Sequence, residues 1–327
     1  MTSGTAVEPR ARRRIPGFEI VVLTVVGAVL LRPLLAPWFD GPVVQTWSTL
    51  FVSTMLQATP FLALGVAFAA AIAAFVPAER LTRVLPKNRV AAVVTGGCAG
   101  VLLPGCECGA VPISGRLVSG GALPGAALAF MLAAPAINPV VLVSTAVAFP
   151  GRPGLVIARF AASLVAAVVM GLIALRFDPK RLIERAMKRS HIGDSRWETF
   201  ASTARHDFLQ AGGFLVLGAA AAAAIQVFVP RSWLTGIGEV ELLAIAVMAI
   251  LAIVLSICSE ADAFVAASFT QVSPTAQLTF MVVGPAVDLK LASMQVGVFG
   301  SRFASRFAPM TAVVATASAA LFGMWLL

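Results

Sequence analysis

The segment Leu103–Pro112 constrains the fold most, because it interrupts a strongly apolar region with residues that cannot continue an ordinary helix. Pro104 and Pro112 remove backbone donors, and the glycines between them favour non-helical dihedrals. The segment also carries three polar or reactive side chains, Cys106, Glu107 and Cys108. In lipid, irregular backbone is tolerated only where protein or a water-filled cavity satisfies its polar groups. The sequence therefore predicts a broken membrane segment at a functional centre.

The composition places the chain in a membrane. Of its 327 residues, 59% are hydrophobic and 12% are charged, whereas soluble domains carry about 25% charged residues. Several apolar runs reach the ~20 residues that cross a hydrocarbon core as a helix. The net charge of +9 lies between these runs, without interleaved aromatic residues, so no nucleic-acid partner is expected. An all-α polytopic membrane protein is the predicted fold class, and the lipid bilayer is its first partner.

The chain divides into five predicted segments. They are a disordered cytoplasmic N-terminus (1–16), an extra first transmembrane helix (17–45), a first transmembrane repeat (46–175), a cytoplasmic basic linker (176–206) and a second, inverted repeat (207–327). Arg302 and Arg306 are expected in a short basic loop before the last span. His191 and His206 are expected to be solvated surface side chains, because a metal site needs a cluster of ligands.

The two repeats are inferred from a match between the halves of the sequence. With a shift of 153, residues 61–81 match residues 214–234 at 13 of 21 positions. With a shift of 150, further pairs coincide: Cys108 with Cys258, Pro124 with Pro274, Pro135 with Pro285, and Asn138 with Asp288. Internal repeats of this kind are typical of transporter folds.

The positive charges predict that the second repeat is inverted. Of the 24 Lys and Arg residues, 18 lie at 10–14, 80–89, 176–205 and 302–306. The positive-inside rule makes these segments, and the N-terminus, cytoplasmic in a multi-pass protein of the inner cell membrane. Residues 90–119 then enter and return on one face, and 239–270 on the other. Because each arm has only about 12–17 residues, we expect two re-entrant helical hairpins, each accompanied by a broken transmembrane helix, with tips meeting near the midplane.

Thiols and ionisable groups at the two tips and the two breaks form the predicted substrate site. An ionisable group within the membrane is expensive and is therefore a functional candidate. The candidate substrate-binding residues are Cys106, Glu107, Cys108, Asn138, Cys258, Glu260, Asp262 and Asp288. The structural alternative is that Asp288 pairs with Lys290, or that the polar groups cap exposed helix ends.

Cys106 and Cys108 flank one residue, so they would point in nearly opposite directions from a regular helix. From an irregular tip they can converge, and thiolates select soft metals and metalloids. No zinc-type spacing accompanies them, so neither a permanent metal nor a cofactor is expected. The alternative is that cysteines fill apolar space, which we favour for Cys98.

Three motifs give the chain a family resemblance. They are Gly-Cys-Glu-Cys-Gly-Ala-Val-Pro at 105–112, Leu-Ala-Phe-Met-Leu-Ala-Ala-Pro-Ala-Ile-Asn-Pro at 128–139, and Pro-Ala-Val-Asp at 285–288. In these motifs the chain resembles the predicted-permease family that includes the ArsP-type organoarsenical efflux permeases. The resemblance spans nearly the whole membrane part. It implies a permease whose best-known relatives export trivalent methylated arsenicals, with Cys106 and Cys108 in the implicated positions.

The predicted function is a secondary permease, not an enzyme, that exports a small soft or thiophilic substrate such as a trivalent organoarsenical. No ATP-binding loop of the G-x-x-x-x-G-K-[ST] type is present, and the buried carboxylates would exchange protons or offset charge. Two alternatives stay open: transport of a small sulfur compound or another anion, and a membrane-embedded thiol redox enzyme with a nearby cation such as Arg116. A non-transporting scaffold is disfavoured, because it has no need of charged, broken tips. The candidate partners are the substrate, whether a small molecule or a metalloid, and a second copy in a homodimer.

Overall fold

The computed structural model is helical, and the residues it describes contain no β-strand. It describes residues 41–75, 86, 88–102, 107–176, 195–228 and 240–327. The chain divides into two compact units, residues 1–46 and 47–327, and the contacts discussed below lie within the second. The predicted N-terminal tail, nearly all of the predicted extra first helix, most of the basic linker, and Cys106 lie outside the described residues.

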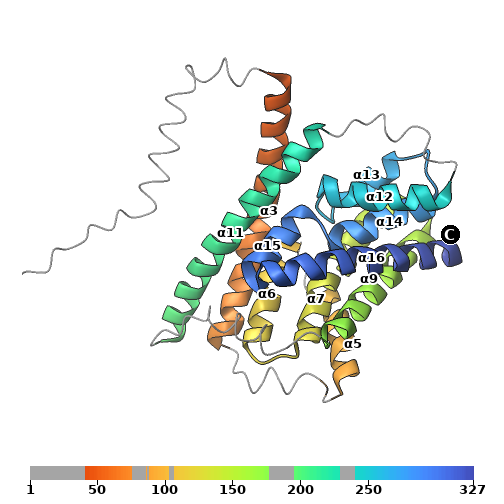
Figure 1. Cartoon of the computed structure of the whole chain (residues 1–327). Helices are drawn as coiled ribbons and strands as arrows, with labels where there is room; N and C mark the ends of the chain where they lie inside the picture. The colour runs from red at the N-terminus through yellow and green to blue at the C-terminus, as the bar shows by residue number, and fades with distance from the viewer. Residues whose placement is uncertain (1–40, 76–85, 87, 103–106, 177–194, 229–239) are drawn as a thin grey trace, which may run out of the picture. The chain divides into compact units, whose positions relative to one another are not determined.

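The helices follow one another in similar order in the two halves of the sequence (Figure 1). The first half contains α3 (Pro42–Phe75), α5 (Arg89–Ala99), the 3₁₀ helix η1 (Gly100–Leu102), α6 (Glu107–Ser119), α7 (Pro124–Ile137), α8 (Pro139–Ala148) and α9 (Pro153–Ala174). The second contains α11 (Arg196–Phe228), α12 (Glu241–Leu255), α13 (Asp262–Ser268), α14 (Pro274–Ala286), α15 (Leu289–Phe299) and α16 (Ser301–Leu326).

Local sequence sets where these helices begin. Proline occupies the first turn of α7, α8, α9 and α14, where its missing N–H costs no hydrogen bond. Asn88 caps α5 by accepting from the Val90 N–H at 2.9 Å, and Ser273 caps α14 by accepting from the Ala276 N–H at 3.1 Å. The helix boundaries thus follow short-range signals in the chain.

Five described stretches are long and apolar enough to cross a membrane. They are Pro42–Ile72, Pro124–Ala148, Pro153–Ala174, Pro274–Phe299 and Ser301–Leu326. Two of them are broken, since α7 continues into α8 and α14 into α15. Many large apolar side chains on these helices face outward, among them Leu56, Val143, Ile157, Val313 and Leu321. Helices that are apolar on their outer face as well as their inner face are expected in lipid.

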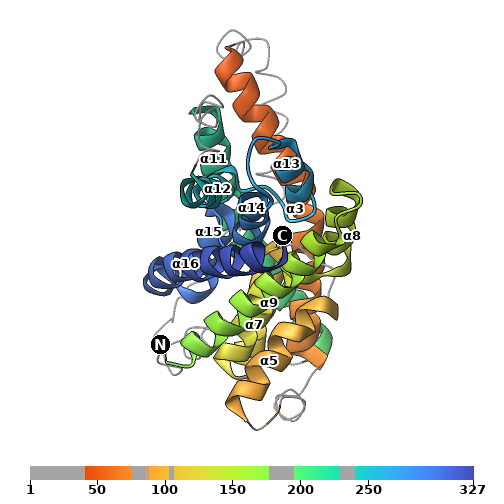
Figure 2. The ribbon, with the colours of Figure 1, turned by 90° about the vertical axis from the view of Figure 1, so that its right-hand side faces the viewer.

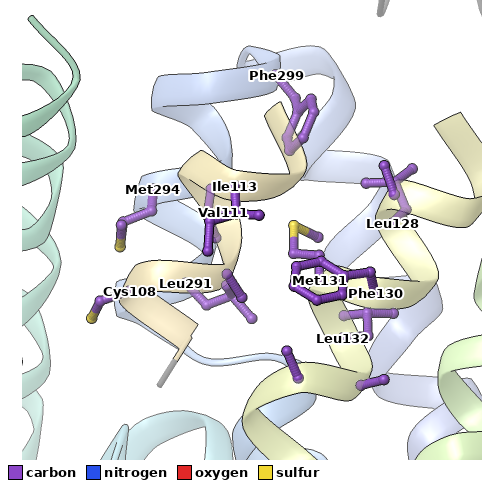
Figure 3. Packing of buried hydrophobic residues seen from close by; sticks show 14 of the residues in the cluster. Cys108, Val111, Ile113, Leu128, Phe130, Met131, Leu132, Leu291, Met294 and Phe299 are labelled. Atoms are coloured by element: carbon purple, nitrogen blue, oxygen red, sulfur yellow. The ribbon is translucent and has the colours of Figure 1, made fainter. Parts of the chain in front are cut away.

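The two helices α7 and α14 are the most deeply buried. Every residue of α7 is buried, between α5, α6 and α9, and α14 is similarly enclosed by α12, α13 and α16. Figure 2 shows α5, α7 and α9 side by side. Small residues permit this closeness: a Cβ on Gly125 would lie 2.6 Å from the Gly171 carbonyl oxygen. Figure 3 shows the apolar cluster between α6, α7 and α15.

One predicted loop is helical, and the end of the predicted linker is part of a helix. Arg302 and Arg306, expected in a basic loop, are exposed residues in the first two turns of α16. Gly300, with φ of 92°, makes the turn by itself, so α16 starts at the next residue. The end of the predicted linker likewise belongs to α11, which begins at Arg196.

The close approach of α3 to α6 depends on a glycine and gives a first prediction. A Cβ at position 65 would collide with the backbone of Gly109, next to Cys108, whereas nothing lies within 4 Å of a Cβ at Gly213. We expect Gly65→Ala to destabilise the protein by about 1–3 kcal/mol through overpacking. Gly213→Ala should be neutral or stabilising by up to about 1 kcal/mol, as for alanine in a helix. Thermal unfolding in detergent measures both, and equal midpoints would contradict the packing.

Candidate functional site

A fully buried lysine lies at the centre of the site. The Nζ of Lys290 donates to Glu107 Oε1 at 3.1 Å and lies 3.5 Å from Asp288 Oδ2. It also donates to Cys258 Sγ at 3.6 Å, and the exposed fraction of Lys290 is 0%. The four side chains come from the start of α6, the segment between α12 and α13, and the start of α15. One ammonium therefore joins parts of the chain far apart in sequence.

The two breaks in the long helices place Asn138 and Asp288 at equivalent positions. Asn138 caps α8: its Oδ1 accepts from the Val141 N–H at 3.0 Å, and its Nδ2 donates to the Ala134 carbonyl at 3.0 Å. Asp288 caps α15 by accepting from the Leu291 N–H. Both side chains thus satisfy backbone groups that a helix break exposes. Asp288 differs from Asn138 because its second carboxylate oxygen, Oδ2, faces Lys290.

The predicted second tip corresponds to residues 256–262, from the end of α12 to the first residue of α13, and we call this segment the α12–α13 tip. Helix α12 ends because Ser256 adopts a left-handed conformation, with φ of 47°. The Ser256 hydroxyl accepts from the Leu289 N–H at 3.2 Å and donates to the Ile253 carbonyl at 2.9 Å. This serine fastens the tip to the start of α15, and so places Cys258 beside Lys290.

A second buried cation holds the other end of the same tip. Arg159 of α9 has an exposed fraction of 0%. Its Nη2 lies 2.7 Å from Asp262 Oδ2 and donates to the Ser259 carbonyl at 3.3 Å. Its Nη1 donates to Thr145 Oγ1 at 2.8 Å. Lys290 therefore contacts the α12–α13 tip through Cys258, and Arg159 contacts it through Ser259 and Asp262.

Carboxylates outnumber cations around the tip. The carboxylates are Glu107, Glu260, Asp262 and Asp288, and the cations are Lys290 and Arg159. Glu260 lies within electrostatic range of Glu107 and of both cations. Several buried oxygens have no hydrogen-bond partner, including Glu107 Oε2, Ser259 Oγ, Glu260 Oε2 and Asp262 Oδ1. Burying an uncompensated charge is costly. The unpartnered oxygens are therefore suited to bind protons or to accept hydrogen bonds from a ligand.

A third ion pair links the halves away from the tip. Arg116 near the end of α6 binds Asp207 of α11 through two hydrogen bonds, Nε to Oδ2 at 2.9 Å and Nη2 to Oδ1 at 2.8 Å. This pair resembles the Glu107–Lys290 and Arg159–Asp262 pairs in joining a residue before 176 to one after 206. It also shows that Arg116 is engaged by Asp207, not reserved for a thiol.

The predicted site residues fall into three groups. Glu107, Cys258 and Asp288 surround Lys290, and Cys108 lies within electrostatic range of it. Cys108 is buried in the first turn of α6 and belongs to the apolar cluster of Figure 3. Asp262 pairs with Arg159, Glu260 lies within electrostatic range of Glu107, Lys290 and Arg159, and Asn138 caps α8. Cys106 lies outside the described residues. The described residues offer no group of three or more His, Cys, Asp or Glu arranged to hold a metal ion.

Two central residues were not predicted as members of the site. Lys290 was considered only as a structural partner of Asp288, and the model shows that contact together with one to Glu107. Arg159 was missed. Its signal was a lone arginine inside the apolar span 153–174, where an ionisable residue is a functional candidate by default.

The Lys290 cluster gives a prediction on stability. Lys290→Met leaves Glu107 and Asp288 buried without their cation, which should cost about 3–5 kcal/mol. Adding Glu107→Gln removes one uncompensated charge and should restore part of that loss. Arg302→Met, at an exposed position, is the control. Thermal unfolding in detergent is the measurement, and a Lys290→Met midpoint equal to that of the control would contradict the ion cluster.

Comparison with known proteins agrees with a membrane permease. The model of a family described as "Predicted permease", ArsP_1, matches residues 44–324. The "UPF0718 protein YcgR" of Bacillus subtilis is 38% identical over 263 residues, covering 78% of this chain and 90% of its own. A "Putative two-component membrane permease complex subunit" of Streptococcus mutans is 30% identical over 273 residues, covering 81% and 91%. No solved structure matches. The chain belongs to the ArsP_1 predicted permease family and is a multi-pass membrane protein.

Proposed function

We propose that the chain is a secondary transporter that exports a small thiophilic substrate, such as a trivalent organoarsenical, through the site around Lys290. The observation that carries this proposal is the buried contact of 3.6 Å between Lys290 Nζ and Cys258 Sγ, with Cys108 in electrostatic range of the same ammonium. A thiol, a cation and a carboxylate meet here away from bulk water. A purely structural core has no need of this combination.

The chemistry of the cluster suits a soft substrate. Cysteine sulfur is a soft ligand that binds metalloids, and Cys258 and Cys108 are both close to Lys290. Cys108 and Cys258 come from opposite halves of the sequence, so one substrate atom bound by both would bridge the two halves. The adjoining Cys106 is a third candidate ligand in this proposal, because it directly precedes Glu107.

The proposed architecture is a pair of inverted repeats, each with a re-entrant hairpin. Its support is the parallel order of short and broken helices in the two halves, and the equivalent capping roles of Asn138 and Asp288. Helices α6 and α12 have 13 and 15 residues, whereas crossing the hydrocarbon takes about 20. In this arrangement both tips approach the site, and the N-terminus is cytoplasmic in the inner membrane.

The partners belong to the proposal as well. The name of the Streptococcus relative describes a subunit of a two-component complex, so a second subunit is a candidate beside the homodimer. The substrate itself is a small molecule or metalloid. No resident cofactor is included.

Two other functions have a specific observation in their favour. Transport of a sulfur compound or another anion is favoured by the buried cations Lys290 and Arg159. A membrane-embedded thiol redox enzyme is favoured by the cation beside Cys258, although that cation is Lys290 instead of the expected Arg116. Both differ from the leading proposal in what the protein does to an arsenical.

Transport by cysteine variants tests the function. In everted vesicles given phenylarsine oxide, we expect Cys108→Ser and Cys258→Ser each to lower uptake by roughly tenfold, the effect of losing about 1.4 kcal/mol of binding. Cys98→Ser is the matched control, because Cys98 is exposed on α5. Equal uptake by all variants would remove the thiols from the mechanism. Uptake of thiosulfate in place of the arsenical would favour the anion alternative, and oxidation of the arsenical without uptake would favour the enzyme.

Labelling from the two membrane faces tests the hairpins. Cysteines would be placed at Val90 and Ser119, at the ends of the first hairpin, and at Val240 and Ser268, at the ends of the second. An impermeant thiol reagent should label the first two positions from one face and the last two from the other, in right-side-out and everted vesicles. Labelling of Val90→Cys and Ser119→Cys from opposite faces would show that the first hairpin crosses the membrane.

A further inference from the structure

A cavity lies at the ends of the helices that carry the Arg159 cluster. Its volume is about 490 Å³, and it is open on one side. Its polar lining comprises Arg152, Thr270 and Gln277, beside Ala148 and Ala267. Gln277 has an exposed fraction of 5%, and its Oε1 has no hydrogen-bond partner. The rest of the lining is apolar, but an open cavity with three polar side chains and an unsatisfied buried acceptor is suited to hold water.

The cavity and the Arg159 cluster lie on the same three helices. Arg152 at the start of α9 is seven residues from Arg159, which is about two helical turns or 10 Å. Ala148 is three residues from Thr145 on α8, so the two share a face, and Ala267 lies on α13, which begins at Asp262. The buried pair between Arg159 and Asp262 therefore lies about two turns inward from water.

The carboxylates around Asp262 outnumber the nearby cations, so one carboxylate is able to bind a proton. Arg159 pairs with Asp262, Glu107 lies within electrostatic range of both Asp262 and Glu260, and Lys290 and Arg159 are both within range of Glu260. Helices α8 and α14, which pack against α13, contribute no titratable side chain. Asp262 Oδ1 and Glu260 Oε2 are both unpartnered. A proton on one of these oxygens removes a buried, uncompensated charge.

We propose that Asp262, positioned by Arg159, and the neighbouring Glu260 form a proton-coupling site that exchanges protons with water through the cavity lined by Arg152 and Gln277. The proposal rests on the proposed transport function and names its coupling ion. In each cycle one of the two carboxylates takes up a proton that enters from the cavity and crosses about two helical turns, and it later releases that proton to solution on the other face. The α12–α13 tip connects this site to the substrate site, because Asp262 contacts Arg159 and Cys258 contacts Lys290. Protonation of Asp262 weakens its ion pair with Arg159. The tip then moves, and Cys258 shifts relative to Lys290.

Infrared difference spectroscopy of the purified full chain tests the site without any substrate. Acidification should produce a carbonyl band of a protonated carboxyl group in apolar surroundings. We expect Asp262→Asn or Glu260→Gln to remove about one carboxyl equivalent of this band, since the two share one proton. Glu198→Gln, at an exposed position on α11, should leave the band unchanged. A band of wild-type size in both tip variants would overturn the proposal.

Transport in proteoliposomes tests the coupling. With phenylarsine oxide as probe, one exchanged proton should give about a tenfold accumulation per unit of pH gradient. Asp262→Asn should reduce the accumulation ratio to about one. Asp207→Asn removes a carboxylate from the comparable pair with Arg116 and should retain the gradient response. Accumulation by Asp262→Asn at the wild-type ratio would overturn the coupling. Failure of the wild type to transport the probe would contradict the proposed substrate, and the infrared band would then decide the proton site.

Discussion

A buried ammonium with no access to water imposes the central constraint on this chain. The exposed fraction of Lys290 is 0%, so its charge must be balanced by protein groups. Asp288 is close to it in sequence, but Glu107 is 183 residues away, and their oxygens lie 3.5 and 3.1 Å from Nζ. The start of α6 and the break between α14 and α15 must therefore meet. Both carboxylates lie at the start of a helix: Glu107 is in the first turn of α6, and Asp288 caps α15.

Ion pairs across the halves have a physical reason in lipid. Apolar helices gain little from contact with one another there, because lipid tails are equally apolar. Small residues let helices approach, as Gly125 and Gly171 do for α7 and α9, but they leave the register between halves weakly determined. The Arg116–Asp207 and Arg159–Asp262 pairs fix it, since a shift of one helical turn would leave charges buried without partners. A movement between the two halves would therefore change the same ion pairs that hold the halves in place.

The sequence predicted those features that short-range signals determine. Prolines and a capping residue mark the break at Asn138, and the thiol and acid at 107–108 mark the first tip, so these residues were identified. Arg159 was missed because its partner, Asp262, is 103 residues away and no local pattern connects the two. The basic loop at Arg302 and Arg306 was predicted from charge alone, and it is helical because Gly300 completes the turn. The membrane class follows from composition and is supported by the family match, whereas the inversion of the repeats rests on loop charges and stays a prediction.

The charge balance of the site bears on which substrate it can serve. An anion that sought Lys290 would have to displace Glu107 and Asp288, and each displaced carboxylate would then lie buried without a cation. A neutral thiophilic molecule needs no such displacement, because the thiols of Cys108 and Cys258 would replace two hydroxyl groups on arsenic, their protons leaving with those groups as two waters, while the ion cluster stays intact. With carboxylates in excess of cations, the site also favours an arriving molecule that donates hydrogen bonds, such as a hydrated trivalent arsenical before its hydroxyl groups leave as water. The electrostatics therefore favour the proposed soft, neutral substrate over the anion, and in this proposal the variable charge is carried by protons on the tip.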